Sequence, residues 1–176
     1  MIVLAADQFV KYLTITHLPE QKAVPVLGSF LQLYYIRNAG AAFSIGEGAT
    51  WIFTIALTAV AAVIVWKSFS TRSRLWAVVL GALLGGVLGN LGDRLFRAPG
   101  FPMGHVVDMI SMPWMIPAIF NVADVFIVTG MISIALLIIT GLRLDGTRER
   151  TAPTRDTPAD EDPAASDAAA RPGDGA

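Results

Sequence analysis

Two aspartates, Asp108 and Asp124, stand 16 residues apart in a part of the chain that otherwise avoids acidic side chains. The first 142 residues contain only six carboxylates, which are Asp7, Glu20, Glu47, Asp93, Asp108 and Asp124. Four of the six fall in hydrophobic or nearly hydrophobic stretches, where an ionised side chain is costly to insert into a membrane. Two carboxylates held close together can share one proton, so that one activates water while the other stays protonated. The pair therefore predicts hydrolysis by two acids, without a metal.

The composition of the chain argues against several classes of protein and of catalytic site. The 176 residues are 54% hydrophobic, they contain no cysteine and two histidines, and their mean hydropathy of +0.58 is too high for an ordinary soluble domain. The missing cysteines exclude disulfides and a thiol nucleophile, and two histidines argue against a zinc site or a Ser-His-Asp triad. The net charge is +2 for residues 1–142 and −3 for residues 143–176, so neither part predicts a nucleic-acid partner.

Apolar runs predict four membrane helices, at about 1–16, 50–67, 75–92 and 119–142. A helix needs about 20 residues to cross about 30 Å of hydrocarbon. The first run contains Asp7 and Lys11 and lacks a basic start, which argues against a cleavable signal peptide. Gly81, Gly85 and Gly89 recur every fourth residue and predict close packing of a neighbouring helix.

Clusters of basic residues orient these helices. Lys67, Arg72 and Arg74 lie in one short loop, and Arg143, Arg148 and Arg150 follow the last span. The positive-inside rule places both clusters and both termini in the cytoplasm, with Asp93, Asp108 and Asp124 near the opposite face. Residues 143–176 have no hydrophobic periodicity and predict a disordered cytoplasmic tail.

A short extracytoplasmic sheet is predicted between the first two spans. Phe30–Arg37 is rich in Leu, Tyr and Ile and favours a strand, and Asn38-Ala-Gly40 favours a turn. Trp114, between Pro113 and Pro117, is typical of an anchor at the membrane surface. The expected fold class is an all-α polytopic membrane protein with four transmembrane helices and a small extracytoplasmic β-sheet.

Each acidic motif also has a purely structural interpretation. Asn121-Val-Ala-Asp124 has the spacing of a helix capping box, and Asp108 is compatible with a solvated loop. Asp93 and Arg94 are adjacent, so they form either a surface ion pair or a support for the segment that carries Asp108. Asp7 and Lys11, four residues apart, face the same side of a helix and are expected to pair.

The order of these motifs carries more information than any one of them. Asp7 and Lys11 come first, then Arg37-Asn-Ala-Gly-Ala-Ala-Phe43, then Gly85-Gly-Val-Leu-Gly-Asn-Leu-Gly-Asp-Arg94, Val106-Val-Asp108 and Phe120-Asn-Val-Ala-Asp124. Together with four spans, this order over residues 1–142 resembles the bacterial lipoprotein signal peptidases (signal peptidase II). Relative to that pattern, the first span is short at its N-terminus, which predicts a late start or a truncation, and the interval from Asp108 to Asp124 is slightly short.

The resemblance implies an intramembrane aspartic endopeptidase that removes the signal peptide from diacylglyceryl-modified prolipoproteins just before the lipid-bearing cysteine. It implies Asp108 and Asp124 as the catalytic dyad, and no cofactor. It further implies a substrate groove or supporting shell made of Asn38, Asn90, Asp93, Arg94, Asn121, Asp7 and Lys11. Its partners would be prolipoproteins and membrane lipids, and the enzyme would be a monomer in the cytoplasmic membrane, with its site near the outer face.

Three alternatives remain open at the level of sequence. Asp93 could replace Asp108 as the partner of Asp124, although Arg94 beside it would favour the ionised form and a dyad member must be able to hold a proton. A proton-coupled transporter would also place acids in a membrane, but it predicts acids at several depths and an internal repeat, and neither is visible. A structural membrane protein leaves the joint occurrence of the motifs unexplained.

Overall fold

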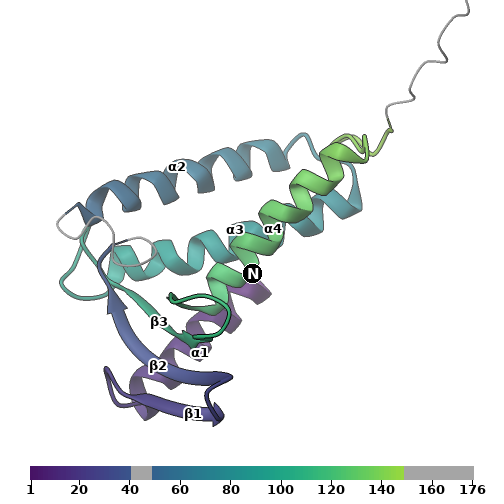
Figure 1. The fold of residues 1–176 in the computed structure, drawn as a ribbon. Helices are drawn as coiled ribbons and strands as arrows, with labels where there is room; N and C mark the ends of the chain where they lie inside the picture. The colour runs from purple at the N-terminus through teal and green to yellow at the C-terminus, as the bar shows by residue number, and fades with distance from the viewer. Residues whose placement is uncertain (41–48, 149–176) are drawn as a thin grey trace, which may run out of the picture.

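The computed structural model describes residues 1–40 and 49–148, coloured along the chain in Figure 1. Its elements in chain order are α1 (Ile2–His17), β1 (Ala23–Leu27), β2 (Leu31–Asn38), α2 (Thr50–Ser68), α3 (Arg74–Phe96), β3 (Val106–Ser111), β4 (Ile119–Phe120) and α4 (Val122–Ile139). The sequence predicts a disordered tail from residue 143, and the residues of this tail from 149 on lie outside the described ranges. The same holds for 41–43 of the Arg37–Phe43 motif.

Among the described residues, three helices are long and apolar enough to cross a membrane, namely α2, α3 and α4. The remaining helix, α1, has 16 residues, which rise about 24 Å, less than the roughly 30 Å of a bilayer core. The prediction of several membrane helices with a small sheet is thus confirmed, while a fourth span stays a proposal. The term all-α is wrong for this fold, because four strands form one antiparallel sheet.

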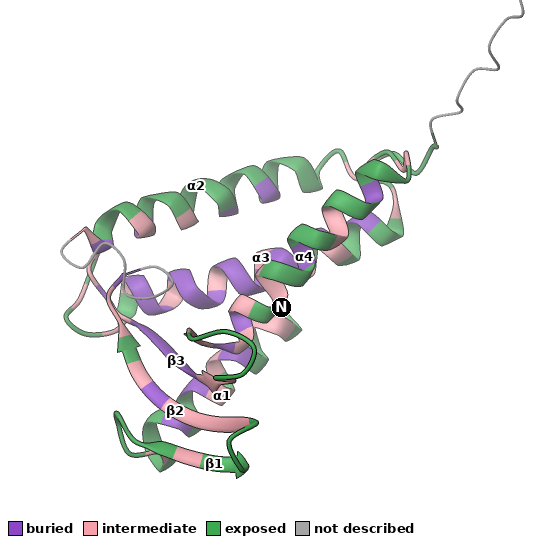
Figure 2. Cartoon of the chain, in the orientation of Figure 1, coloured by how far each residue is buried: buried purple, intermediate pink, exposed green. Residues whose placement is uncertain are grey.

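The central helix is α3, which packs against α1, α2 and α4. It contains more buried residues than any other described helix, as the purple segments of Figure 2 show. It continues to Phe96, four residues beyond the predicted end at Gly92. The helix tolerates the charges of Asp93 and Arg94 because both side chains find partners inside the protein, where they are 0% and 3% exposed.

Glycines let α3 approach its neighbours closely, as their spacing predicts. A Cβ atom on Gly85 would lie 2.7 Å from Val3 Cβ of α1, and one on Gly86 would lie 2.6 Å from the carbonyl oxygen of Ala123 in α4. Gly81, the first glycine of the stripe, has no atom within 4 Å of such a Cβ. The close packing is therefore found in the second half of α3, where this helix contacts α1 and the start of α4.

A pair of alanine substitutions tests this packing. Gly86→Ala is expected to lower the free energy of unfolding by about 1–3 kcal/mol, because the backbone of α4 would have to move. Gly81→Ala has open space around it and is expected to raise stability by about 0.5–1 kcal/mol. Thermal unfolding of the two purified variants in one detergent measures the difference. Equal melting temperatures would contradict the close approach of α3 and α4.

The sheet has the order β1-β2-β3-β4 and rests against α1 and α3 through β3. The predicted strand Phe30–Arg37 is confirmed as β2, shifted by one residue. A loop was one interpretation for Asp108, but the residue lies within β3 and pairs with Ile36 of β2. Two residues further along β2, Asn38 pairs with Val106 of β3. The register of two strands therefore brings Asn38 and Asp108 together.

The loop between β3 and β4 is attached to the β1–β2 turn. The ring of Trp114 stacks on that of Phe30 with centroids 4.6 Å apart, and its indole N–H donates to the carbonyl oxygen of Phe30 at 2.8 Å. Trp114 remains 58% exposed. The stack ties the loop that precedes α4 to the outer part of the sheet.

Candidate functional site

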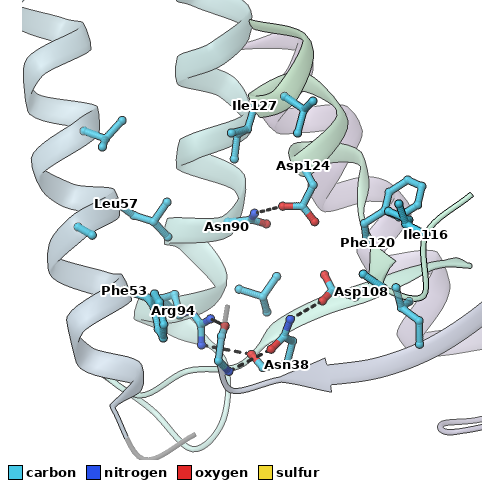
Figure 3. Close-up of a pocket in the computed structure, with 17 residues that line it drawn as sticks. Asn38, Phe53, Leu57, Asn90, Arg94, Asp108, Ile116, Phe120, Asp124 and Ile127 are labelled. Carbon is cyan, nitrogen blue, oxygen red and sulfur yellow. Dashed lines mark hydrogen bonds between the residues drawn. The ribbon is translucent and has the colours of Figure 1, made fainter. Parts of the chain in front are cut away.

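A groove of about 440 Å³ lies between α2 and α4, with α3 behind it. Its walls are apolar, and one end holds a group of polar side chains (Figure 3). The apolar walls include Phe53, Leu57, Val60, Ile127 and Val128, and the polar end is formed by Asn38, Asn90, Arg94, Asp108 and Asp124. The two aspartates singled out by their spacing thus line one cavity, together with three of the predicted supporting residues.

Asp108 points into the groove from β3 and is only 2% exposed, so a solvated loop is the wrong interpretation. Asn38 Nδ2 donates to its Oδ2 at 2.9 Å, and Asn121 Nδ2 donates to its Oδ1 at 2.6 Å. Burial raises the pKa of Asp108 to about 7, and the nearby Asp124 adds to the rise, whereas the two amide hydrogen bonds oppose it. Asp108 can therefore carry a proton near neutral pH.

Asp124 is held in a capping box at the start of α4, as the motif Asn121-Val-Ala-Asp124 predicts. The backbone N–H of Asn121 donates to Asp124 Oδ2 at 3.0 Å, and the N–H of Asp124 donates to Asn121 Oδ1 at 3.0 Å. Asn90 Nδ2 donates to the other oxygen, Oδ1, at 2.7 Å. The capping-box interpretation of this motif is therefore confirmed. It is compatible with a role of Asp124 in chemistry, because the cap orients the carboxylate toward the groove.

Asn121 connects the two aspartates. Its backbone N–H binds Asp124, while its side-chain amide donates to Asp108 and also to Asn90 Oδ1, the latter at 3.1 Å. Asn90 Oδ1 receives a further hydrogen bond from Lys11 Nζ at 2.9 Å. Because an ammonium group can only donate, Lys11 forces the NH₂ group of Asn90 toward Asp124. Both aspartates thus accept hydrogen bonds from amides of fixed orientation.

A buried ion cluster lies behind the groove. Lys11 Nζ is 2.9 Å from Asp7 Oδ2 and 2.8 Å from Asp93 Oδ2, and all three side chains are fully buried. Arg97 Nε approaches Asp93 Oδ1 to 2.5 Å. The expected pairing of Asp7 with Lys11 is confirmed. Of the two interpretations considered for Asp93 and Arg94, the surface ion pair is wrong, because the cations paired with the buried Asp93 are Lys11 and Arg97.

This cluster also holds the backbone beside each aspartate of the groove. Asp7 Oδ1 accepts a hydrogen bond of 2.9 Å from the N–H of Ala123, the residue before Asp124. Asp93 Oδ2 accepts one of 3.2 Å from the N–H of Val107, the residue before Asp108. Lys11 joins the two acceptors, so one buried cation fixes the positions of α4 and β3 relative to each other.

Arg94 binds backbone carbonyl oxygens, whereas its neighbour Asp93 belongs to the ion cluster. Its Nη1 donates to the carbonyl oxygens of Asn38, Ala39 and Gly104, and its Nη2 donates to that of Gly40. Its guanidinium also lies 5.8 Å from the ring centre of Phe53. Arg94 therefore holds the turn after β2 that presents Asn38 to Asp108.

Two polar residues of this network were not predicted. Gln8 Nε2 donates to Asp93 Oδ1 at 3.2 Å and to the carbonyl oxygen of Gly89 at 3.0 Å, and Arg97 pairs with Asp93. Two features of the sequence could have indicated these residues. Gln8 is polar within an apolar helix, and Arg97 follows Asp93 by four residues, the spacing of an ion pair on a helix.

Comparison with known proteins agrees with this site. The family model for signal peptidase (SPase) II matches residues 1–140. A lipoprotein signal peptidase of Leifsonia xyli is 49% identical over 150 residues, which cover 85% of this chain and 69% of that protein. The one of Mycobacterium tuberculosis strain H37Rv is 41% identical over 152 residues, covering 86% and 74%. A solved bacterial membrane enzyme is similar with a TM-score of 0.68 and 29% identity, covering 78% of this chain and 83% of that one. Matches of this extent show that the chain belongs to the signal peptidase II family, whose members are proteases that cleave signal peptides from prolipoproteins.

Proposed function

We propose that residues 1–142 form an aspartic endopeptidase that cuts diacylglyceryl-modified prolipoproteins directly before the lipid-bearing cysteine. One observation supports this most strongly: Asp108 and Asp124 line the same apolar groove, and both are hydrogen-bonded by Asn121. This provides two carboxylates for acid–base chemistry beside a surface suited to a lipid and an apolar signal peptide. The reaction needs no metal or cofactor.

In the proposed mechanism, Asp124 is the base and Asp108 carries the shared proton. Asp124 takes a proton from water, and the water oxygen attacks the scissile carbonyl carbon while Asp108 protonates the carbonyl oxygen. The proton on Asp124 then passes to the leaving nitrogen, the C–N bond breaks, and Asp108 recovers its proton. The deep burial of Asp108 and its pKa of about 7 support this division of roles.

The groove also suggests how substrate is held. The apolar side chains of α2 and α4 would contact the signal peptide and the acyl chains. Arg94 also lines the groove, so its cationic side chain would lie beside the substrate. Asn38, Asn90 and Asn121 would keep both carboxylates in place, and Asp7, Lys11 and Asp93 would support them from behind.

The membrane arrangement is part of the proposal. With α1 as a fourth, short span, both ends of the chain lie in the cytoplasm, and the sheet and the polar end of the groove lie near the outer face of the bacterial cytoplasmic membrane. The clustering of basic residues supports this orientation. The enzyme would act as a monomer surrounded by membrane lipids, and its cytoplasmic tail would begin at residue 143.

Asp108 is a better partner for Asp124 than Asp93 is. Asp93 does not line the groove, and its two oxygens are occupied by Lys11, Arg97, Gln8 and the N–H of Val107. Both oxygens of Asp93 are therefore already engaged within the protein, and neither faces the groove.

The function is tested with the purified chain in detergent and a synthetic peptide that carries a diacylglyceryl cysteine after a signal sequence. We expect one cut, before the cysteine, with a free N-terminal cysteine amine in the product detected by mass spectrometry. The same peptide without the diacylglyceryl group is the control and is expected to react poorly. Equal cleavage of both peptides would contradict lipoprotein specificity.

The rate of this cleavage should depend on pH in a defined direction. Below about pH 7 Asp108 holds its proton, and above that pH it loses it, so kcat is expected to fall as pH rises through this range. At strongly acid pH the base is protonated as well and the rate falls again. Steady-state kinetics from pH 4 to pH 9 measure both limbs. A rate that stays constant from pH 6 to pH 9 would contradict a proton on Asp108.

A further inference from the structure

A second surface hollow lies on the other side of α3 and shares no lining residue with the groove that holds the two aspartates. It has two neighbouring parts. The first, which we call the α1–α3 groove, has a volume of about 560 Å³, and its walls include Leu4, Leu88, Leu91, Gly92 and Leu95 together with the polar Gln8 and Asp93. The second, which we call the basic recess, has a volume of about 310 Å³ and is lined by Ile15, Tyr35, Arg37, Arg97 and His105. Phe96 and Arg97 line both parts, so the two lie next to each other.

The hollow has the length of one membrane leaflet. Leu4 at one end and Ile15 at the other are 11 residues apart on α1. This separation corresponds to about 16 Å along the helix. Half of the hydrocarbon core of a bilayer is about 15 Å thick. The apolar part lies deeper among the helices, and the basic part lies where α1 and α3 end at the sheet.

The charges of the basic recess favour an anion. Its described lining contains Arg37, Arg97 and His105 but no carboxylate, and Arg97 pairs through Nε with Asp93, which lines the neighbouring α1–α3 groove. Glu20 lies 3.4 Å from Arg37 outside the recess, and both side chains are more than 40% exposed, at 41% and 45%, so this pair binds weakly. Guanidinium groups bind phosphate oxygens well, through paired N–H donors.

We propose that this hollow binds an anionic phospholipid, with the headgroup phosphate in the basic recess and one acyl chain in the α1–α3 groove. A zwitterionic headgroup fits less well, because its ammonium would meet the same cations. A free phosphate ion would leave the apolar part unused. This site does not depend on the proposed peptidase chemistry, and its test measures lipid binding rather than cleavage.

Two substitutions separate the parts of the site, and each has a matched control. A Cβ atom at Gly92 would have no neighbouring atom within 4 Å, so Gly92→Leu places a larger side chain at the wall of the α1–α3 groove. Gly81 is equally open but lies outside the hollow, and Gly81→Leu is its control. Arg37→Gln removes a charge from the recess, and Arg72→Gln removes one from the exposed loop between α2 and α3.

Native mass spectrometry of the full chain in detergent, titrated with dioleoyl phosphatidylglycerol, provides the measurement. The first lipid is expected to bind about tenfold more weakly to Gly92→Leu and to Arg37→Gln, while both controls bind as the wild type does. Dioleoyl phosphatidylcholine should bind the wild type more weakly than phosphatidylglycerol.

Three results would overturn the proposal. They are equal binding by Gly92→Leu and Gly81→Leu, equal binding by Arg37→Gln and Arg72→Gln, or equal affinity of the wild type for the two lipids. Inorganic phosphate alone is the last arm of the test. If millimolar phosphate displaced the lipid completely, the site would be assigned to the free anion. Thermal unfolding of each variant shows that loss of binding does not come from loss of fold, and Arg37 provides an independent surface variant if Gly92→Leu is unstable.

Discussion

Asp124→Asn is expected to lower kcat for peptide cleavage by about 10³-fold, because the amide cannot take a proton from water. Its NH₂ group would also meet the NH₂ group of Asn90, which Lys11 keeps turned toward this position. Asp108→Asn is expected to have an effect of the same size, because the proton carrier is lost. The NH₂ group of the new asparagine would face the NH₂ group of Asn38 or of Asn121. Neither of these two amides can turn over, because the Oδ1 atom of each accepts a hydrogen bond from a backbone N–H.

Two further variants make this comparison decisive. Asp145→Asn changes an exposed acid after the last helix and should cleave at the wild-type rate. Asp93→Asn should keep partial activity, because the asparagine can still accept the hydrogen bond from the N–H of Val107. If Asp108→Asn remained fully active while a folded Asp93→Asn lost cleavage, the dyad would have to be Asp93 and Asp124.

The second large effect concerns stability. Lys11→Met removes the buried cation that pairs with Asp7 and Asp93 and leaves both acids fully buried. We expect the free energy of unfolding to fall by about 3–5 kcal/mol. Cleavage should fall too, since the acceptors that hold Ala123 and Val107 would no longer be joined. Denaturant or thermal unfolding in detergent measures the first effect, and kcat measures the second.

The control is Lys22→Met, which removes an exposed lysine and should change neither quantity. The triple variant Lys11→Met, Asp7→Asn, Asp93→Asn removes the three fully buried charges of the cluster together and leaves only the partly exposed Arg97 without its carboxylate, so its stability should recover by most of the loss. If Lys11→Met unfolded at the same temperature as Lys22→Met, the ion cluster would not be fixing the positions of α4 and β3.

Hydrophobicity and charge patterns are enough to predict the helices of this chain. The charge-free runs at residues 50–66 and 75–92 locate α2 and α3 closely, and the capping pattern at Asn121 locates the start of α4. The spacing of four between Asp7 and Lys11 predicts their ion pair. These signals are local, because each depends on residues within one or two turns of a helix.

The sheet and the amide network could not be predicted in the same way. The segment Val106–Ser111 is short, and only its pairing with β2 makes it a strand. The contacts of Asn38 with Asp108 and of Asn90 with Asp124 join residues 70 and 34 positions apart. Nothing near Asp93 in sequence indicates that Lys11, rather than the adjacent Arg94, is its partner. Such contacts depend on how the elements pack, which a pattern within one element does not encode.

The position of the groove between α2 and α4 has a consequence for kinetics. A substrate anchored by acyl chains reaches such a groove sideways, by diffusing within the plane of the bilayer. Its effective concentration is then its mole fraction among the surrounding lipids or detergent molecules rather than its molarity in water. At a constant molarity of lipopeptide, added detergent should slow cleavage by surface dilution, and apparent KM values become comparable only when expressed as mole fractions.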